Sequence, residues 1–322
     1  MSGEICVVVE VVRGELTEQT FVSLAAGRKL ADALGCRLAA VMLGADVAPL
    51  AAALGAADRV LAVEHPLLAD FNPEAALLAA ESAVRAAGAR ACIFCHTASG
   101  MDLACGVAHR LGAPVVACCR DFTAADGQAR YVAVTCGGKI IVEGTLPGPV
   151  CVVTVMPGVL RAEQGRSDRT PPVERISPPA GMESVRTKFR GWIDPPAGDV
   201  DISRQNILVS VGRGIQKKEN IALAERLAAA LGGVVTGSRP IIDQGWLPPT
   251  RLVGKSGKQV RPRLYLAVGI SGAPEHMEGV PAAELMIGIN TDARAPIFDA
   301  AHYGATCDAV QLMPALAAAL EK

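Results

Sequence analysis

The residues best suited to chemistry lie in five short loops in the last third of the chain. Each loop is rich in glycine or small polar residues and adjoins an apolar segment of strand or helix length. Glycine lets backbone N–H groups approach a ligand closely, while serine, arginine and asparagine supply directed hydrogen bonds. Together these groups could hold a ligand the size of a nucleotide. The loops are 211–215 (VGRGI), 238–240 (SRP), 253–258 (VGKSGK), 269–273 (GISGA) and 289–292 (INTD).

Two of these loops resemble phosphate-binding motifs. Gly212-Arg-Gly214 follows an apolar run and precedes a helical pattern, a position where free N–H groups and the helix dipole favour an anion such as pyrophosphate. A tight turn with a solvated arginine would have the same sequence, and the tripeptide alone does not separate the two. Gly254-Lys-Ser256 matches the end of a P-loop, but Pro249 stands where that motif requires glycine. We therefore do not expect ATP hydrolysis.

Composition narrows the class of protein. With 322 residues, 51% of them hydrophobic and 20% charged, the chain can bury a large core, and its length favours two domains. A net charge of −1 without a basic cluster argues against nucleic acid as a partner. The N-terminal residues lack a signal-peptide pattern, and no apolar run reaches the ~18 residues of a membrane span. We expect a cytoplasmic protein with no direct membrane insertion.

The ten cysteines read as reduced thiols, because nothing in the chain marks it for secretion. Cys92-Ile-Phe-Cys95-His96 matches the attachment pattern of c-type haem. The same residues form an apolar run of strand length, in which cysteine acts as a small buried hydrophobe. This second interpretation is preferred, and it applies equally to Cys118-Cys119.

The first half of the chain has the pattern of β-α-β units with a parallel sheet. Gly35, Gly55, Gly88 and Gly112 each follow a helical stretch, where glycine commonly ends a helix. Three later runs have no helix between them and predict an antiparallel extension of the sheet. These runs are 129–134, 139–144 and 150–155; the expected parallel strands are 5–12, 37–43, 59–62, 91–95 and 115–117, and the expected helices are 20–34, 47–54, 73–87 and 103–111.

A proline-rich segment separates this part from a second α/β pattern. We place the boundary near residue 200, giving domains 1–200 and 201–322, and residues 183–190 alternate like an edge strand. The second domain is expected to be doubly wound and flavodoxin-like, with ligands at the carboxyl ends of its strands. Its expected strands are 206–211, 234–236, 264–269 and 285–289, and its helices are 219–231, a short one near His276, and 313–320. The prolines of the boundary are Pro171, Pro172, Pro178, Pro179, Pro195 and Pro196.

Seven motifs follow one another along the second domain. They are 211–220 (VGRGIQKKEN), 237–240 (GSRP), 243–246 (DQGW), 257–265 (GKQVRPRLY), 269–273 (GISGA), 295–298 (APIF) and 302–304 (HYG). In this order they resemble the FAD-binding domain of electron transfer flavoprotein α subunits. The resemblance covers residues 206–322, and over residues 1–200 it rests mainly on the alternating α/β layout.

This resemblance implies a heterodimer with a β subunit, against which the first domain packs, and one FAD held by the second domain. It places Arg213 near the pyrophosphate, Arg239 against the isoalloxazine and Ser256 near N5 of the flavin. His276 should approach O2, while Asn290 and Asp308 should hold the adenosine end. The full set of implied cofactor contacts is Arg213, Ser238, Arg239, Val253, Gly254, Lys255, Ser256, Ser271, Gly272, Ala273, Pro274, Glu275, His276, Asn290 and Asp308.

These side chains also make chemical sense around a flavin. A flavin that takes up one electron without a proton becomes anionic, and a cation near N1 and O2 stabilises that charge. Arg239 and His276 are suitable groups. Such chemistry needs no general acid, nucleophile or metal, and the five histidines show no metal-binding spacing.

Two loops depart from the family pattern. Lys255 and Glu275 stand where the family usually has uncharged glutamines, and we expect them either to form a compensating ion pair beside the flavin or to point into solvent. Pro274 removes a backbone donor from the second loop.

Three functions remain open from the sequence. The first is an electron carrier that accepts electrons from flavin dehydrogenases of the acyl-CoA or demethylating type, as in fatty acid β-oxidation, and passes them to a quinone reductase or another acceptor. The second is the α subunit of an electron-bifurcating complex that oxidises NADH, whose second flavin would lie largely in the β subunit. The third is a nucleotide-sensing or structural protein on the same fold, because fold does not fix function. The arginine, hydroxyl and histidine positions argue against the third function, because a protein that only binds adenosine would not need them. The carrier is the preferred function, although this chain alone does not decide between it and the bifurcating complex.

Overall fold

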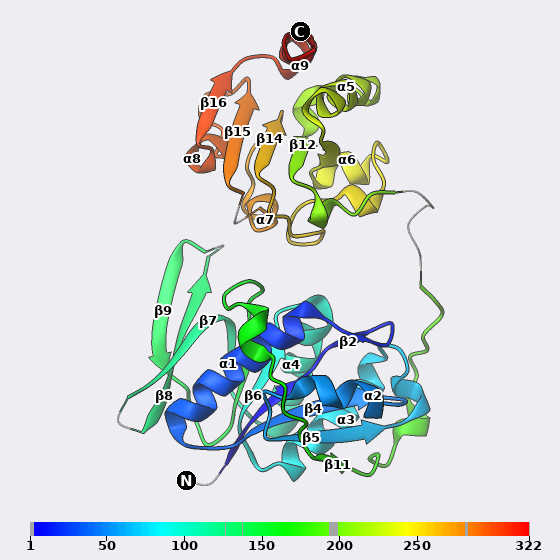
Figure 1. Ribbon diagram of the computed structural model, residues 1–322, viewed down its shortest axis with the longest axis vertical. Coiled ribbons are helices and arrows are strands. Elements are labelled where there is room, and N and C mark those ends of the chain that lie inside the picture. Colours follow the sequence, from blue (N-terminus) through cyan, green and yellow to red (C-terminus); the bar gives the residue numbers. More distant parts are fainter. Residues whose placement is uncertain (1–2, 126, 137, 193–198, 281–282, 322) are drawn as a thin grey trace. The chain divides into compact units, whose positions relative to one another are not determined.

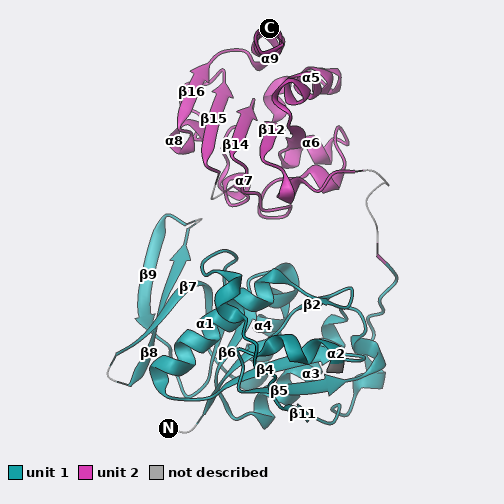
Figure 2. Ribbon diagram, viewed as in Figure 1, with its two compact units in different colours: residues 1–191 teal, residues 192–322 magenta. Residues whose placement is uncertain are grey.

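The computed structural model describes residues 3–125, 127–136, 138–192, 199–280 and 283–321. The chain forms two compact units, residues 1–191 and 192–322 (Figure 2). Residue 200, the boundary expected from the sequence, falls within the second unit, and Pro195 and Pro196 lie outside the described residues. Among the described residues, no helix has the length and apolar character needed to span a bilayer.

Unit 1 is built on one mixed sheet, in the strand order β11-β5-β4-β1-β6-β10-β7-β8-β9 (Figure 1). The pairings from β11 to β7 are parallel, and β7, β8 and β9 form an antiparallel extension. This confirms the expected class of fold. The strands are β1 (Glu4–Val8), β4 (Leu38–Gly44), β5 (Arg59–Glu64), β6 (Ala89–Cys95), β7 (Val115–Ala125), β8 (Gln128–Thr135), β9 (Ile140–Thr145), β10 (Cys151–Val155) and β11 (Val173–Arg175).

Helices bury both faces of the central parallel strands. Ile5 and Val7 of β1 pack in one core with α1 (Glu18–Leu34), whereas Cys6 and Val8 pack in the other core with α3 (Pro73–Ala86) and α4 (Ala98–Leu111). Because both faces are covered, the strands are continuously apolar. Cys92 and Cys95 of β6 are almost fully buried in this way, which confirms that they are strand residues of the core.

Helix ends follow the expected chemistry. Thr17 and Thr97 cap the starts of α1 and α4 by accepting backbone N–H bonds, and Gly35 and Gly112 end these helices in the left-handed region at φ 62°. Gly55, by contrast, has φ −58°, because the expected helix over 47–54 is only the single turn α2 (Ala48–Ala51) followed by a 3-10 turn (Ala52–Leu54).

Two expectations for unit 1 are wrong. The run at 150–155 was expected in the antiparallel extension, but β10 lies parallel between β6 and β7. A short loop after β9 returns the chain to the sheet centre, where Val153 and Val155 become fully buried. Residues 183–190 form no strand; the edge strand is β11, and Met182 starts a single 3-10 turn as a buried anchor. Alternation of apolar and polar residues does not distinguish an edge strand from an irregular segment that is held to the domain by one buried apolar side chain.

Unit 2 carries a parallel sheet in the order β13-β12-β14-β15-β16, which is the flavodoxin-like order and confirms the expected doubly wound fold. Helix α5 (Ile221–Leu231) packs with α9 (Ala309–Leu320) in one core, while α7 (Pro274–Met277) and α8 (Ile297–Ala300) adjoin the other core. The strands are β12 (Ile207–Val211), β13 (Val234–Gly237), β14 (Leu264–Val268), β15 (Leu285–Asn290) and β16 (Tyr303–Thr306).

The last strand, β16, was not predicted from the sequence. Among the described residues this edge strand pairs with β15 alone, and Tyr303 is 69% exposed, so the segment lacks the apolar run that signals a buried strand. Order reverses between β12 and β14, because β13 lies on one side of β12 and the following strands lie on the other. The carboxyl ends of β12 and β14 are therefore the expected ligand position.

In unit 1 the strand order also reverses, between β1 and β6. The side chain of Glu10 lies at the carboxyl ends of these two strands, where a ligand would otherwise be expected. Glu10 follows β1, and its Oε1 accepts hydrogen bonds from Thr97 Oγ1 at 2.6 Å and Ser99 Oγ at 2.5 Å. Its Oε2 accepts from Thr17 Oγ1 at 3.2 Å. Since Thr17 and Thr97 begin α1 and α4, the carboxylate also lies at the positive ends of two helix dipoles.

Replacing Glu10 with alanine should therefore destabilise unit 1. Loss of a charged acceptor leaves three hydroxyl groups without that partner and should lower the free energy of unfolding by roughly 2 kcal/mol. Urea unfolding followed by far-UV circular dichroism would measure this. Glu15→Ala, at an exposed position, is the control and should stay close to the parent. Equal midpoints for the two variants would contradict the role given to Glu10.

Candidate functional site

Polar loops from four strands of unit 2 meet around one cavity of about 600 Å³. They follow β12 (Gly212 to Gly214), β13 (Ser238 to Pro240), β14 (Gly269 to Ala273) and β15 (Asn290). The segment 252–256 and two residues of α7, Glu275 and His276, complete the lining. The residues expected at the site all line this cavity except Gly272, Pro274 and Asp308. Lining residues outside the expected set are Gly212, Gly214, Pro240, Leu252, Gly269 and Ile270.

The β12 and β14 loops touch through two glycines. Gly214 N donates to Gly269 O at 3.0 Å, and a Cβ on Gly214 would lie 2.6 Å from the Gly269 Cα. Gly269 itself has φ 64°. Neither position has room for a side chain, so the backbones of both loops stay close together where they line the cavity.

Arg213 has a different setting from the one expected. It begins a single 3-10 turn, Arg213–Ile215, and α5 begins only at Ile221. Arg213 is therefore not at the N-terminus of a long helix, and its exposed guanidinium rather than a helix dipole supplies the positive charge here. This break in the helical pattern could not be predicted from the sequence, because the polar residues 216–220 are compatible with the first turn of a helix.

Arg239 is held in place by two side chains. Its Nε donates to Asp243 Oδ1 at 2.6 Å, one helical turn further along α6 (Arg239–Asp243), and its Nη1 donates to Ser256 Oγ at 3.3 Å. The guanidinium remains 62% exposed. Asp243 was not among the expected site residues, although its spacing of four from an arginine is a recognisable helix-pair signal.

His276 is buried and uncharged at neutral pH. Burial lowers its pKa to about 4, an effect that the nearby Val253 carbonyl only partly offsets. Burial thus disfavours the charged form that the sequence suggested for His276. Its Nε2 lies 2.8 Å from the hydroxyl of Tyr265, and its Nδ1 is buried without a hydrogen bond to any described residue.

Tyr265 sets which histidine nitrogen remains available. The hydroxyl is fully buried, which raises its pKa, so the group keeps its proton and can donate it to Nε2 of His276. A neutral imidazole that accepts at Nε2 carries its proton on Nδ1. His276 can then donate from Nδ1 to an acceptor in the cavity that it lines.

Asn290 and Asp308 fasten loops to one another. Asn290 Nδ2 donates to Ile270 O at 2.9 Å, and its Oδ1 accepts from Asp292 N at 2.9 Å, which ties the β14 loop to the end of β15. Asp308 caps α9 through Val310 N, and its Oδ2 accepts from Gln216 at 3.2 Å. Asp308 is not part of the cavity lining.

The expected ion pair between Lys255 and Glu275 is wrong. Lys255 Nζ lies 3.3 Å from Glu278 Oε2, whereas Glu275 offers its backbone carbonyl to Lys255 N at 2.7 Å. Glu278 directly follows the helical turn α7, and this turn brings its carboxylate, not that of Glu275, toward Lys255. Pro274 is the first residue of that turn, where a helix needs no N–H donor.

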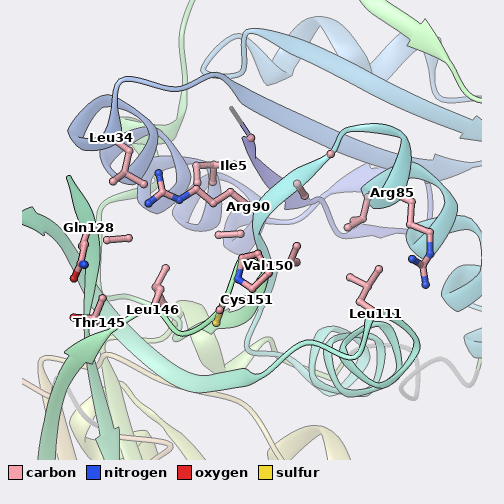
Figure 3. A pocket seen from close by; sticks show the side chains of 18 residues that line it. Ile5, Leu34, Arg85, Arg90, Leu111, Gln128, Thr145, Leu146, Val150 and Cys151 are labelled. Carbon is pink, nitrogen blue, oxygen red and sulfur yellow. The ribbon is translucent and has the colours of Figure 1, made fainter. Parts of the chain in front are cut away.

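A second cavity, of about 810 Å³, lies in unit 1 at the amino edge of its sheet (Figure 3). Apolar residues such as Ile5, Leu34 and Val150 dominate its lining, and no sequence motif marked it. Arg90 and Arg85 also line it, but each donates to a backbone carbonyl. Ligands of parallel α/β sheets bind at the opposite, carboxyl edge, which is where the cavity of unit 2 lies.

Fold and site together define a two-domain α/β protein with a nucleotide-sized site on a flavodoxin-like sheet. The family model described as the electron transfer flavoprotein FAD-binding domain matches residues 201–281 of this sequence. A second family model, the electron transfer flavoprotein domain, matches residues 5–180. The chain therefore belongs to the electron transfer flavoprotein family, and the cofactor of its second domain is FAD.

Relatives agree over nearly the whole chain. Protein FixB of Azorhizobium caulinodans is 36% identical over 96% of this chain and 86% of its own length. The acryloyl-CoA reductase electron transfer subunit beta of Anaerotignum propionicum is 33% identical over 99% and 96%, respectively. The electron transfer flavoprotein subunit alpha of Syntrophomonas wolfei is 30% identical over 96% of each chain.

The residues around the cavity fit FAD. Closely packed glycines leave backbone groups open to a phosphate or ring edge, Arg213 and Arg239 can balance negative charge, and the buried Nδ1 of His276 needs an acceptor. The cavity volume is also within the range of cofactor sites.

Burial of neutral His276 should make unit 2 sensitive to acid. Below its ordinary pKa of 6.5 the unfolded chain binds a proton that the folded chain does not bind until about pH 4, so the free energy of unfolding falls as pH drops through this window. The full loss is roughly 3 kcal/mol. Urea titrations of flavin-free protein from pH 7.5 to 4, followed by tryptophan fluorescence, would show it.

His276→Gln should flatten this pH dependence, since glutamine does not titrate in the window. His109→Gln, at an exposed position in unit 1, is the control and should retain the parent slope. An unchanged slope in His276→Gln would assign the acid sensitivity to other groups.

Proposed function

We propose that this protein is the FAD-binding α-type subunit of a heterodimeric electron transfer flavoprotein. It pairs with a β subunit, accepts electrons from a flavin dehydrogenase and passes them to an acceptor oxidoreductase, such as a quinone reductase. The observation that supports this most is the arrangement around one cavity of a braced arginine, Arg239, and a buried neutral histidine, His276. A site that only held adenosine would need neither group.

The bound FAD supplies one- and two-electron redox chemistry, and the protein adjusts how readily it does so. Arg239 is fixed by Asp243 and Ser256, so its charge can stabilise a negatively charged ring system without reorganising. His276 contributes a neutral donor from inside the protein. The two groups therefore favour electron uptake while adding a single positive charge.

A carrier also fits what the sheet of unit 2 provides. The cavity opens at the carboxyl edge, and Arg239 and Lys255 remain exposed there, which suits a cofactor that must exchange electrons with partner proteins. The Anaerotignum relative is named for acryloyl-CoA reductase, which is consistent with a donor or acceptor that handles acyl-CoA substrates. We place the protein in the cytoplasm, where such dehydrogenases would be met.

Counting flavins in the assembled heterodimer would test this proposal. The chain is co-expressed with a β-type partner, the complex is purified, and bound flavin is measured by absorbance after denaturation. We expect one FAD per heterodimer and no reduction by NADH. Two flavins together with reduction by NADH would instead indicate a bifurcating complex, and no flavin would contradict the proposal.

Removing the charge of Arg239 should make the flavin harder to reduce. Arg239→Ala should lower the first one-electron potential by about 30–60 mV, because 59 mV corresponds to roughly 1.4 kcal/mol in a one-electron couple and the exposed charge is partly screened by water. Spectroelectrochemical titration of the heterodimer would measure the shift.

Arg226→Ala provides the matched control. Arg226 lies exposed on α5, pairs with Glu321 and is absent from the cavity lining, so its loss should leave the potential unchanged. Equal shifts in both variants would point to a general effect of net charge instead of a local one.

A further inference from the structure

A cysteine, a histidine and a threonine converge at the carboxyl edge of the sheet in unit 1. His96 directly follows β6, Thr154 belongs to β10, and Cys118 belongs to β7. His96 Nδ1 lies 2.8 Å from Thr154 Oγ1, and His96 Nε2 lies 3.5 Å from Cys118 Sγ. The imidazole thus bridges a buried hydroxyl and a thiol, on three neighbouring strands.

A β-bulge aims Cys118 at the histidine. Val116 pairs with Val153 and Cys119 pairs with Val155, so Ala117 and Cys118 lie opposite Thr154 alone. Cys118 has φ 58°, a left-handed conformation that costs a non-glycine residue roughly 1–2 kcal/mol. Its N–H compensates by donating to Thr154 Oγ1 at 3.1 Å. Bulges of this kind redirect a side chain, and strain retained in a fold is a pointer to function.

Cys118 differs from the thiols around it. Cys119, Cys95 and Cys151 are buried, and burial raises their pKa to about 12, about 12 and about 11, which leaves them inert. Cys118 is only half-buried and faces an imidazole. A half-exposed thiol next to a histidine is the arrangement that generates a thiolate nucleophile.

We propose that Cys118 is a modification site, a histidine-assisted thiol that hydrogen peroxide oxidises to a sulfenic acid. The thiol proton moves to Nε2 of His96, and the thiolate sulfur attacks one peroxide oxygen. A sulfur–oxygen bond forms as the oxygen–oxygen bond breaks, and the departing hydroxide takes the proton from the imidazolium to leave as water. Sulfur loses two electrons and peroxide gains them. Thr154 positions both reacting partners.

This inference is independent of how the FAD site works. Its oxidant, hydrogen peroxide, is supplied from outside the protein in the test. The sulfenic acid can be reversed by thiols, so Cys118 would report oxidising conditions to a protein whose task is electron transfer.

Alkylation of the FAD-loaded heterodimer tests the reactivity. The complex is treated with limiting iodoacetamide, and alkylation of each cysteine is followed over time by peptide mass spectrometry. Cys105 and Cys136, both exposed, are internal standards in the same chain. We expect Cys118 to react at least about tenfold faster than either, although it is less exposed. A rate at or below theirs, including complete protection by the partner subunit, would overturn the proposal.

His96→Asn separates the histidine's role from simple exposure. Asparagine can still reach Thr154 but cannot accept the thiol proton, so alkylation of Cys118 should fall to the rate of Cys105 or lower. Thr154→Val, a substitution of similar shape, removes the hydroxyl that orients the ring and should slow the reaction severalfold, which keeps the test available if the first variant folds poorly. Far-UV circular dichroism and retained pairing with the β subunit would verify that unit 1 has folded. An unchanged rate in a folded variant would contradict the assignment.

Peroxide oxidation is tested directly. The heterodimer is exposed to hydrogen peroxide together with dimedone, which labels sulfenic acids only. We expect the label at Cys118 in the parent and its loss in His96→Asn. Labelling at Cys105 or Cys136 in place of Cys118 would overturn the proposal.

Discussion

The cavity of unit 2 depends on the direct backbone contact between Gly214 and Gly269. These glycines follow adjacent strands, β12 and β14, at the point where strand order reverses, and a Cβ at either position would overlap the other loop. Such close approach sets the position of Arg213 on one loop and of Ser271 on the other. The remaining loops are fastened to this pair, since Asn290 ties the β14 loop to β15 and Asp308 ties Gln216 to α9.

The cavity is lined by both charged and neutral polar side chains, and the degree of burial distinguishes them. Arg239 is exposed and braced by Asp243, whereas burial lowers the pKa of His276 because water cannot solvate its charged form. Tyr265 lies behind the imidazole and satisfies one of its nitrogens. The cavity is therefore lined by an exposed, braced arginine and by a buried, neutral imidazole.

The two sheets use the same topological position in opposite ways. In unit 2 the reversal of strand order opens a cavity lined by positive and neutral groups. In unit 1 the corresponding position is occupied by Glu10, whose carboxylate accepts hydrogen bonds from the hydroxyl groups of Thr17, Thr97 and Ser99. One acidic side chain thus supplies internally the negative charge that helix N-termini favour.

Much of the fold and of the cavity lining could be predicted from the sequence, because both follow from local patterns of residue type. Apolar runs separated by helical stretches and ended by glycines gave the two α/β units, and the loops after β12, β13, β14 and β15 gave most of the cavity lining, because carboxyl ends of parallel strands share one edge. The polar edge strand β16 and the place of β10 inside the sheet were not readable, since neither depends on local pattern.

Tertiary structure decided the charges and partners. Only the packed structure shows that His276 is buried beside Tyr265 and that Asn290 donates a hydrogen bond to the backbone of the β14 loop. The same is true of the pairing of Lys255 with Glu278 instead of Glu275. The same holds for Cys118 and His96, which a bulge brings together from separate strands. Residue type and spacing fix which groups the chain has. Desolvation and long-range contact fix which of them are charged, paired or reactive, and these are properties of the folded surroundings.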